Sequence, residues 1–113
     1  CDQEAGSAGG TGRGESAILS NASFAAVELM RQGAAPVDAG LEVLRRVTRQ
    51  AERANAWQPG LVDGNGRPTF GLTLYILGLD GTTAGVNLKG GGRYCVADLD
   101  KGPRHEDLVP LHE

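Results

Sequence analysis

The sequence predicts an α+β domain in which a short strand and two helices precede two to three antiparallel strands. Two stretches with helical spacing of apolar residues lie between residues 15 and 53, and β-branched, aromatic and aliphatic residues concentrate after residue 69. The chain has 113 residues, which is enough for one compact unit or part of one. No internal repeat is visible, so residues 1–113 are treated as a single unit.

Composition narrows the classes of partner. Eleven Lys and Arg against fourteen Asp and Glu give a net charge of -3, so the chain lacks the basic surface that nucleic acids and anionic lipids require. No apolar run approaches the roughly 20 residues that cross a bilayer. The two cysteines, Cys1 and Cys95, form no CxxC motif, which favours a reducing compartment such as the cytoplasm. We expect no nucleic-acid and no membrane partner.

The first predicted element is a short strand that ends in a tight turn. Residues 5–14, AGSAGGTGRG, carry almost no side chains, and glycine makes up 18 of the 113 residues, about twice the usual ~7%. Such a segment allows positive φ angles and close approach of the backbone to a ligand. The turn leads directly into an apolar periodic stretch and is the first candidate for a functional site.

Two helices are expected next. Apolar residues recur at positions 18, 22, 25 and 29, and Gly33 suits the position after a helix end, so the first helix is predicted over 15–32. Pro36 suits the first turn of a second helix that extends to about residue 53. Its arginine-rich face contains Glu42 and Arg46 at a spacing that allows pairing, and we interpret it as an ordinary solvated surface.

The remainder of the chain predicts strands. Residues 58–68 are rich in turn formers and form a surface connection. Residues 69–79 and 83–88 then form a hairpin around Asp80-Gly81. After a turn at 89–93, residues 94–97 supply a third strand. The tail from residue 101 is polar and interrupted by proline, and no further strand is expected there.

The strongest local signal is the segment Thr11–Ser16, where backbone N–H groups and a helix N-terminus together favour negative charge. Gly9–Ser16 has the spacing of a phosphate loop, but Glu15 stands where that loop needs lysine. Glu15 also occupies the position where the dinucleotide fingerprint needs a small residue. A non-enzymatic module that binds anions or phosphate at Gly9–Ser16 stays open as an alternative.

The surrounding sequence resembles a known family. The string CDQEAGSAGGTGRGES, a helix ending in MRQGAAP, a second helix and FGLTLYILGLDGTTAG resemble the C-terminal part of the N-terminal-nucleophile asparaginases, the group that contains glycosylasparaginase and isoaspartyl peptidase. The resemblance spans essentially all of the chain. Its specific part is Cys1-Asp2 followed by Thr11-Gly12-x-Gly14-Glu15.

This resemblance implies a fold and an activity. The fold is a four-layer αββα N-terminal-nucleophile hydrolase, of which this chain is a fragment. In the family a precursor cuts itself before a threonine, whose hydroxyl attacks the side-chain amide of asparagine, of N4-glycosylated asparagine or of a β-aspartyl peptide. The free α-amine of that threonine serves as the base. The resemblance implies no metal and no organic cofactor.

It also implies site residues and partners. Thr11 and Gly12 become the catalytic donors that stabilise the oxyanion, and Thr11, Gly12, Arg13 and Gly14 become the substrate-binding loop. The family's nucleophile and its carboxylate-binding residues have no counterpart in these 113 residues, so we expect them on other parts of the precursor. The expected partners are an aspartyl or asparaginyl substrate, the remainder of the precursor (its α subunit and the N-terminal part of its β subunit), and a homodimer of such heterodimers.

Three further features carry alternatives. Cys1 would be an amide-cleaving nucleophile if its own amine activated it, which would make the chain a Cys1 N-terminal-nucleophile amidase. Asp80-Gly81-Thr82 resembles an autocleavage junction, but we interpret it as a hairpin turn. His105 and His112 lack zinc-site spacing with Cys95, so both are expected in solvent.

Overall fold

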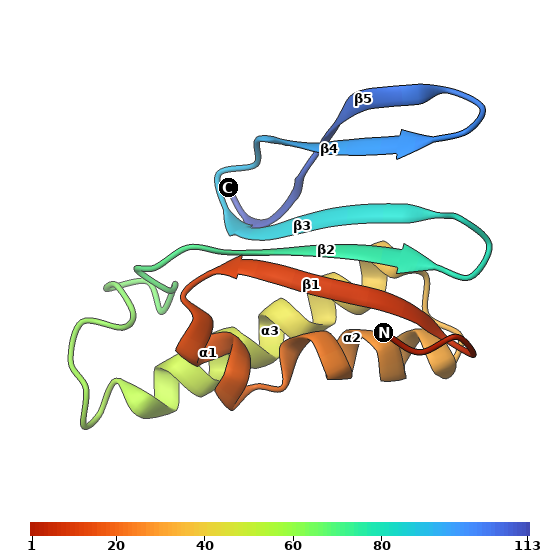
Figure 1. Ribbon diagram of the computed structural model, residues 1–113. Helices are drawn as coiled ribbons and strands as arrows, with labels where there is room; N and C mark the ends of the chain where they lie inside the picture. The colour runs from red at the N-terminus through yellow and green to blue at the C-terminus, as the bar shows by residue number, and fades with distance from the viewer.

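The computed structural model describes all 113 residues and confirms an α+β fold. Three helices cover one face of a four-stranded sheet, and a two-stranded hairpin lies over the opposite face (Figure 1). The helices are α1 (Gly14–Leu19), α2 (Ala22–Arg31) and α3 (Pro36–Ala54). The strands are β1 (Gly6–Gly12), β2 (Leu72–Gly78), β3 (Thr83–Lys89), β4 (Arg93–Asp98), β5 (Gly102–Asp107) and β6 (Val109–His112).

The main sheet has the strand order β1-β2-β3-β6. β1 and β2 are antiparallel, as are β2 and β3, whereas β6 runs parallel to β3. The predicted hairpin around Asp80-Gly81 is confirmed, because Leu77 pairs with Thr83 across it. β1 is therefore an edge strand whose outer side has no partner in this chain.

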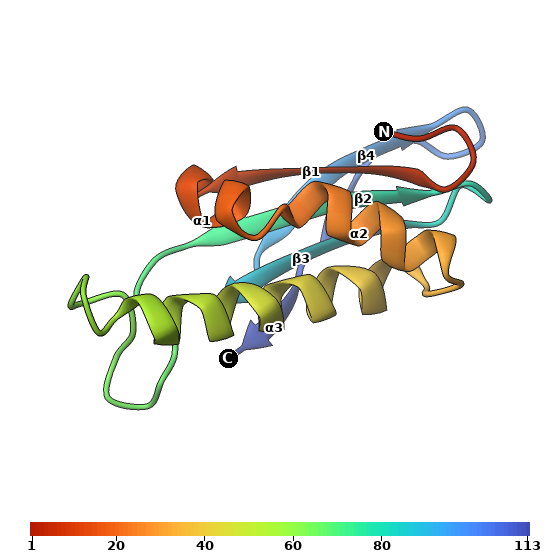
Figure 2. The ribbon, with the colours of Figure 1, turned by 90° about the horizontal axis from the view of Figure 1, so that it is seen from below.

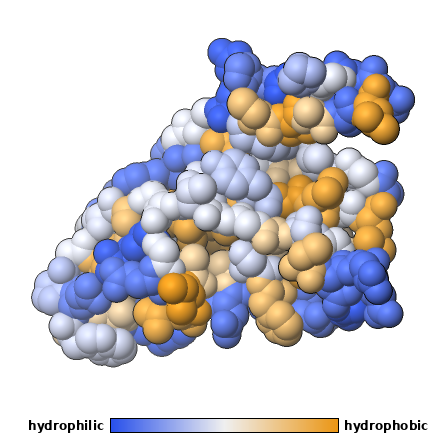
Figure 3. All heavy atoms as spheres, viewed as in Figure 1, coloured by the Kyte–Doolittle hydropathy of each residue, from blue (hydrophilic) through white to orange (hydrophobic).

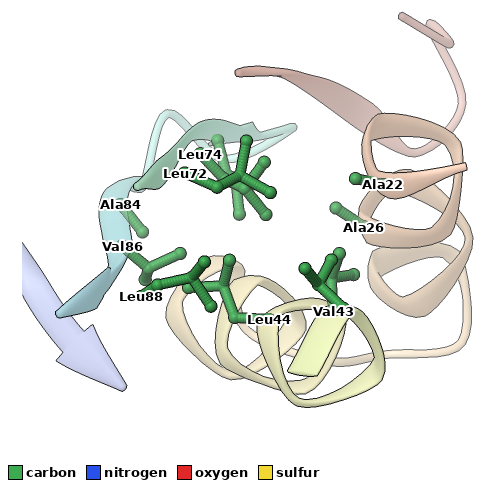
Figure 4. Packing of buried hydrophobic residues seen from close by; sticks show 11 residues of the cluster. Ala22, Ala26, Val43, Leu44, Leu72, Leu74, Ala84, Val86 and Leu88 are labelled. Atoms are coloured by element: carbon green, nitrogen blue, oxygen red, sulfur yellow. The ribbon is translucent and has the colours of Figure 1, made fainter. Parts of the chain in front are cut away.

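The core lies between the sheet and the helices. Alternation along β2 places Leu72, Leu74 and Ile76 on the helix side, where all three are buried. Figure 4 shows side chains from β2, β3, α2 and α3 pointing toward one another in this layer. The predicted second helix is confirmed as α3, which supplies Val43 and Leu44 to the core.

The expectation of one helix over 15–32 is wrong, because the chain breaks between α1 and α2. Asn21 adopts a left-handed conformation with φ 47°, which an α-helix cannot contain but which asparagine tolerates better than most residues. The break turns Ile18 and Leu19 outward, so Ile18 is 76% exposed rather than part of the expected apolar stripe.

The expectation of a tail without strands is also wrong. Residues 102–107 pair with β4 as β5, and residues 109–112 join β3 as β6. Leu108 N donates to Gly92 O, so these two residues are a hydrogen-bonded pair. Bonded and non-bonded pairs alternate along an antiparallel ladder. Pro103, opposite Ala97, therefore lies at a non-bonded pair and needs no N–H. Pro110 lies on an edge strand, where proline is tolerated.

The surface features agree with the sequence reading. Glu42 accepts hydrogen bonds from Arg46 at 3.1 Å and Arg49 at 3.4 Å, and these contacts lower its pKa. The connection over 58–68 contains turns and a single isolated bridge, Val62 with Pro68. None of the helices is both long and apolar enough to cross a membrane.

Gly85 determines how closely the β4–β5 hairpin approaches the sheet. A Cβ atom at Gly85 would lie 2.6 Å from the Tyr94 ring and 2.6 Å from the Leu108 side chain. Tyr94 also packs near Tyr75, with 6.1 Å between ring centroids. Seen from below in Figure 2, β4 crosses the sheet on the side of β1, while the C-terminus lies on the side of α3.

We expect Gly85→Ala to destabilise the chain by about 1–3 kcal/mol, because the added methyl group overpacks against Tyr94 and Leu108. Gly9 is the matched control: it shares a cross-strand row with Tyr75 and Gly85, but nothing lies within 4 Å of its Cβ position. Gly9→Ala is expected to stabilise by about 0.5–1 kcal/mol through lower chain entropy. The midpoints of urea unfolding measure the change in stability of both variants. Equal shifts for the two variants would contradict the packing account.

Candidate functional site

The candidate site lies at the C-terminal end of β1. Thr11 is opposite Thr73, and Arg13 N donates a hydrogen bond of 2.9 Å to Gly71 O. In an antiparallel ladder the bonded pairs alternate, so Thr11 is also bonded to Thr73 through its backbone. Its side chain shares the outer face of the sheet with Tyr75 and Leu77, away from the helices, and Thr11 is exposed.

The N–H of Gly12 points away from β2, toward the open edge of the sheet. The peptide that joins Thr11 to Gly12 directs its carbonyl toward β2, and in a trans peptide the N–H then points the opposite way. Gly12 has φ 125°, and a Cβ atom there would lie 2.4 Å from Gly71 O. Only glycine therefore fits this position. The exposed Thr11 hydroxyl and the outward Gly12 N–H are two donors at one open corner of the sheet.

Arg13 is held by three neighbours. Its Nε donates to Ser16 Oγ at 3.0 Å, its Nη2 lies 2.8 Å from Glu15 Oε1, and its guanidinium lies over the Phe70 ring at 5.2 Å. Ser16 itself is buried. The Arg13 side chain thus fixes the passage from β1 to α1, in addition to the substrate-loop role that the resemblance implies.

The arrangement does not support a phosphate loop. Gly9–Gly12 are extended and paired with β2 rather than folded around an anion. The helix that follows has only six residues. It begins with exposed Gly14 and Glu15, so a carboxylate stands where a phosphate loop has its lysine. Gly9–Ser16 therefore do not form a phosphate loop, and an anion-binding module on these residues stays an untested alternative.

Two residues that the sequence reading did not select lie in the same row as Thr11. Thr73 is its partner on β2, and Asn87 is the partner of Thr73 on β3. Asn87 is 8% exposed; its Nδ2 donates to Gly91 O at 2.7 Å, while its Oδ1 is buried without a partner. This end of the outer face is polar, whereas the next rows contain Tyr75 and Leu77.

The cavities of the chain do not coincide with Thr11 and Gly12. One groove of about 390 Å³ runs along the outer face between β1–β2 and β4, and another of about 410 Å³ lies by Arg31 and Asp80, at the end of the sheet opposite Thr11. Neither Thr11 nor Gly12 lines any cavity. This corner of the sheet is open.

The other sequence features lie elsewhere. Cys1 is exposed and precedes the start of β1, at the end opposite Thr11. Asp80 accepts a hydrogen bond of 2.9 Å from Thr82 N, which lowers the pKa of Asp80 and stabilises the predicted turn. His105 is exposed as expected, but the expectation for His112 is wrong, because its Nε2 is buried. No group of three or more His, Cys, Asp or Glu side chains is arranged to hold a metal ion.

Comparison with known proteins assigns the chain to no family. No protein-family model matches its sequence, and no curated protein matches it.

We expect Arg13→Ala to destabilise the chain by about 1–2 kcal/mol, because it removes the ring contact with Phe70 and leaves buried Ser16 Oγ without its donor. Glu15→Gln serves as the control, since Glu15 is 64% exposed in its side chain and an exposed ion pair contributes at most about 1 kcal/mol. Thermal unfolding measures both variants. Equal losses of stability would contradict the anchoring role of Arg13.

Proposed function

We propose that this chain is the C-terminal part of an N-terminal-nucleophile asparaginase-type amidohydrolase, with Thr11 and Gly12 as the oxyanion donors. The observation that carries the proposal is the pair of donors at the end of β1: an exposed hydroxyl and an N–H that points away from the sheet, on consecutive residues. The substrate class is the side-chain amide of asparagine, N4-glycosylated asparagine or a β-aspartyl peptide.

The chemistry requires this type of corner. When a nucleophile attacks an amide carbon, the carbonyl oxygen gains negative charge, and fixed donors stabilise it; each such donor contributes on the order of 10²–10³ in rate. The tetrahedral intermediate then expels the amine or ammonia and leaves an acyl enzyme, which water hydrolyses. Gly12 suits the role because it has no side chain that would cover its own N–H.

In this proposal, polypeptide outside these 113 residues supplies the attacking group. An N-terminal threonine attacks with its hydroxyl, and its α-amine, whose ordinary pKa is about 7.7–8.0, accepts the proton at neutral pH. Arg13 and Gly14 line the substrate loop, and no metal or organic cofactor takes part. The full assembly contains the remaining precursor segments and two copies of the resulting heterodimer.

The layer order supports the same proposal. The helices cover only one face of the main sheet, and the β4–β5 hairpin lies over the other face (Figure 1). In a four-layer αββα fold the second sheet would occupy that position, with its own helices beyond it. The outer-face residues Tyr75 and Leu77, which are 38% and 45% exposed, would then be covered.

The Cys1 alternative uses a different part of the chain. Five residue steps separate Gly6 from Thr11, which is about 17 Å along an extended strand. Cys1 lies beyond Gly6, and Asp2 bridges back to Gly6 and pairs with Arg31. A nucleophile at Cys1 therefore does not share the Thr11–Gly12 corner, and no observation favours this second function.

In the longer precursor, Thr11→Ala is expected to reduce kcat for release of aspartate about 10²–10³-fold, while Thr11→Ser retains the hydroxyl and most of the activity. Self-cleavage and the unfolding temperature, measured in parallel, report folding. Unchanged kinetics for the alanine variant, with folding intact, would contradict the oxyanion role.

The 113-residue chain alone is expected to release no aspartate from asparagine or from a β-aspartyl dipeptide, because the attacking group is absent. Chromatographic detection of aspartate over a range of pH tests this. Turnover that disappears when Cys1 is alkylated would favour the Cys1 amidase instead.

A further inference from the structure

The groove on the outer face of the sheet has one wall made by a strand edge. Its floor comes from β1 and β2, including Ser7, Gly9, Tyr75 and Leu77, and its wall comes from four consecutive residues of β4, Tyr94, Cys95, Val96 and Ala97. Figure 3 shows the space-filling surface hollowed between the hairpin and the body of the molecule, with apolar residues at the opening.

The backbone of β4 directs unpaired groups into this groove. Because Gly92 and Leu108 form a bonded pair, the bonded positions of β4 that follow are Tyr94 and Val96. The N–H and C=O groups of Cys95 and Ala97 therefore point away from β5. Both residues line the groove, and no residue of β5 does, so the free edge of β4 faces the groove.

Arg93 places a charge at the outer end of this edge, but the part of the edge that faces the groove, at Cys95 and Ala97, lacks the protection that exposed strand edges usually carry. None of the residues that line the groove is charged, whereas natural edges are blocked by charges, proline or bulges. The opposite edge of the hairpin has such protection: β5 contains Pro103, which has no N–H, and exposed Asp107. The two edges of one hairpin thus differ in their capacity to accept a strand.

We infer that the free edge of β4 is a binding site for an extended, uncharged polypeptide segment that adds to the hairpin as a third strand. Its backbone would pair with Cys95 and Ala97, and alternate apolar side chains would contact Tyr75 and Leu77 on the floor. Stacked sheets lie about 10 Å apart. The space beside β4 and over β1 therefore suits one strand rather than a folded second copy of this chain.

The inference goes beyond the proposed function. In the proposed four-layer fold a strand of the second sheet would lie over this face, so the test uses the 113-residue chain, in which the groove is open. The inference concerns backbone groups of β4 and the floor of the groove, and it requires neither Thr11 nor amide hydrolysis. A failure of the kinetic test at Thr11 leaves it intact. Its own test measures binding alone, so its failure leaves the oxyanion proposal intact.

The test uses the ¹⁵N-labelled 113-residue chain and a synthetic peptide in which valine and threonine alternate, with a lysine at each end for solubility. Amide hydrogen exchange is followed by NMR, residue by residue. At saturation the exchange of the Cys95 and Ala97 amides is expected to slow at least ~10-fold, while those of His105 and Asp107, on the other edge, stay unchanged. The same peptide with alternate backbone amides N-methylated is expected to have no effect.

Matched variants separate the edge from the fold. Ala97→Pro removes one groove-facing N–H at a position where the hairpin needs none, as its partner Pro103 shows, and it is expected to weaken peptide binding at least ~10-fold. His105→Pro removes an equivalent N–H from the other edge and is expected to bind normally. If Ala97→Pro fails to fold, Leu77→Lys places a charge on the floor, with Leu99→Lys at the exposed hairpin tip as its control.

Three results would overturn the inference. The first is no change at Cys95 and Ala97 with saturating peptide, and the second is protection of the β5 edge instead. The third is protection of Cys95 and Ala97 that grows with protein concentration in the absence of peptide, together with dimers in sedimentation, since a second copy would then occupy the edge.

Discussion

The hydrogen-bond register between β1 and β2 is the constraint on which the candidate site depends. The bond from Arg13 N to Gly71 O fixes which residues of β1 are bonded to β2 and which direct their backbone groups outward. Thr11 then presents its side chain on the outer face, and Gly12 presents its N–H at the open edge. A shift of one residue would exchange these roles and turn Thr11 toward the helices.

Glycine makes this register possible for steric reasons. A Cβ atom at Gly10 would lie 2.9 Å from the Leu74 side chain and one at Gly12 would lie 2.4 Å from Gly71 O. A side chain at either position would therefore collide with β2. The same shortage of side chains leaves little bulk on the outer face of β1, and the groove beside β4 occupies that space.

The helices cover one face of the sheet, and the β4–β5 hairpin covers part of the other. The helix side of the sheet contains leucine, isoleucine and valine, while the outer side contains Tyr75, Leu77 and the closely packed contact of Gly85 with Tyr94. The hairpin covers only part of this outer side. The proposed oxyanion corner and the proposed binding edge of β4 lie at separate places on the uncovered part. The first is defined by hydrogen-bond donors and the second by unpaired backbone groups and an uncharged surface.

Sequence reasoning could predict elements whose signal is local. The periodic apolar stripe predicts helix α3, and the turn at Asp80-Gly81 predicts the β2–β3 hairpin. The break at Asn21 was not predictable from periodicity, because Ile18 continues the apolar pattern while its side chain is exposed. β5 and β6 were missed because Pro103 and Pro110 are tolerated only through pairing partners that the sequence does not reveal.

The same distinction holds for the site. The resemblance to a family points to Thr11 and Gly12 as donors, whereas Thr73 and Asn87 can be recognised only from the pairing of β1, β2 and β3. Thr73 alternates with Leu74 in the sequence, which places Thr73 on the face opposite the core. That Thr11 lies beside Thr73 depends on a pairing between residues sixty-two positions apart. The motif identifies the donors, and the register identifies their neighbours.

The central claim is most directly tested by residue-resolved amide hydrogen exchange along β1. The register predicts slow exchange at Ser7, Gly9, Thr11 and Arg13, whose N–H groups are bonded to β2, and fast exchange at Ala8, Gly10 and Gly12. An inverted pattern, with a protected Gly12 amide, would show that this N–H is occupied by the fold and would contradict its role as an oxyanion donor.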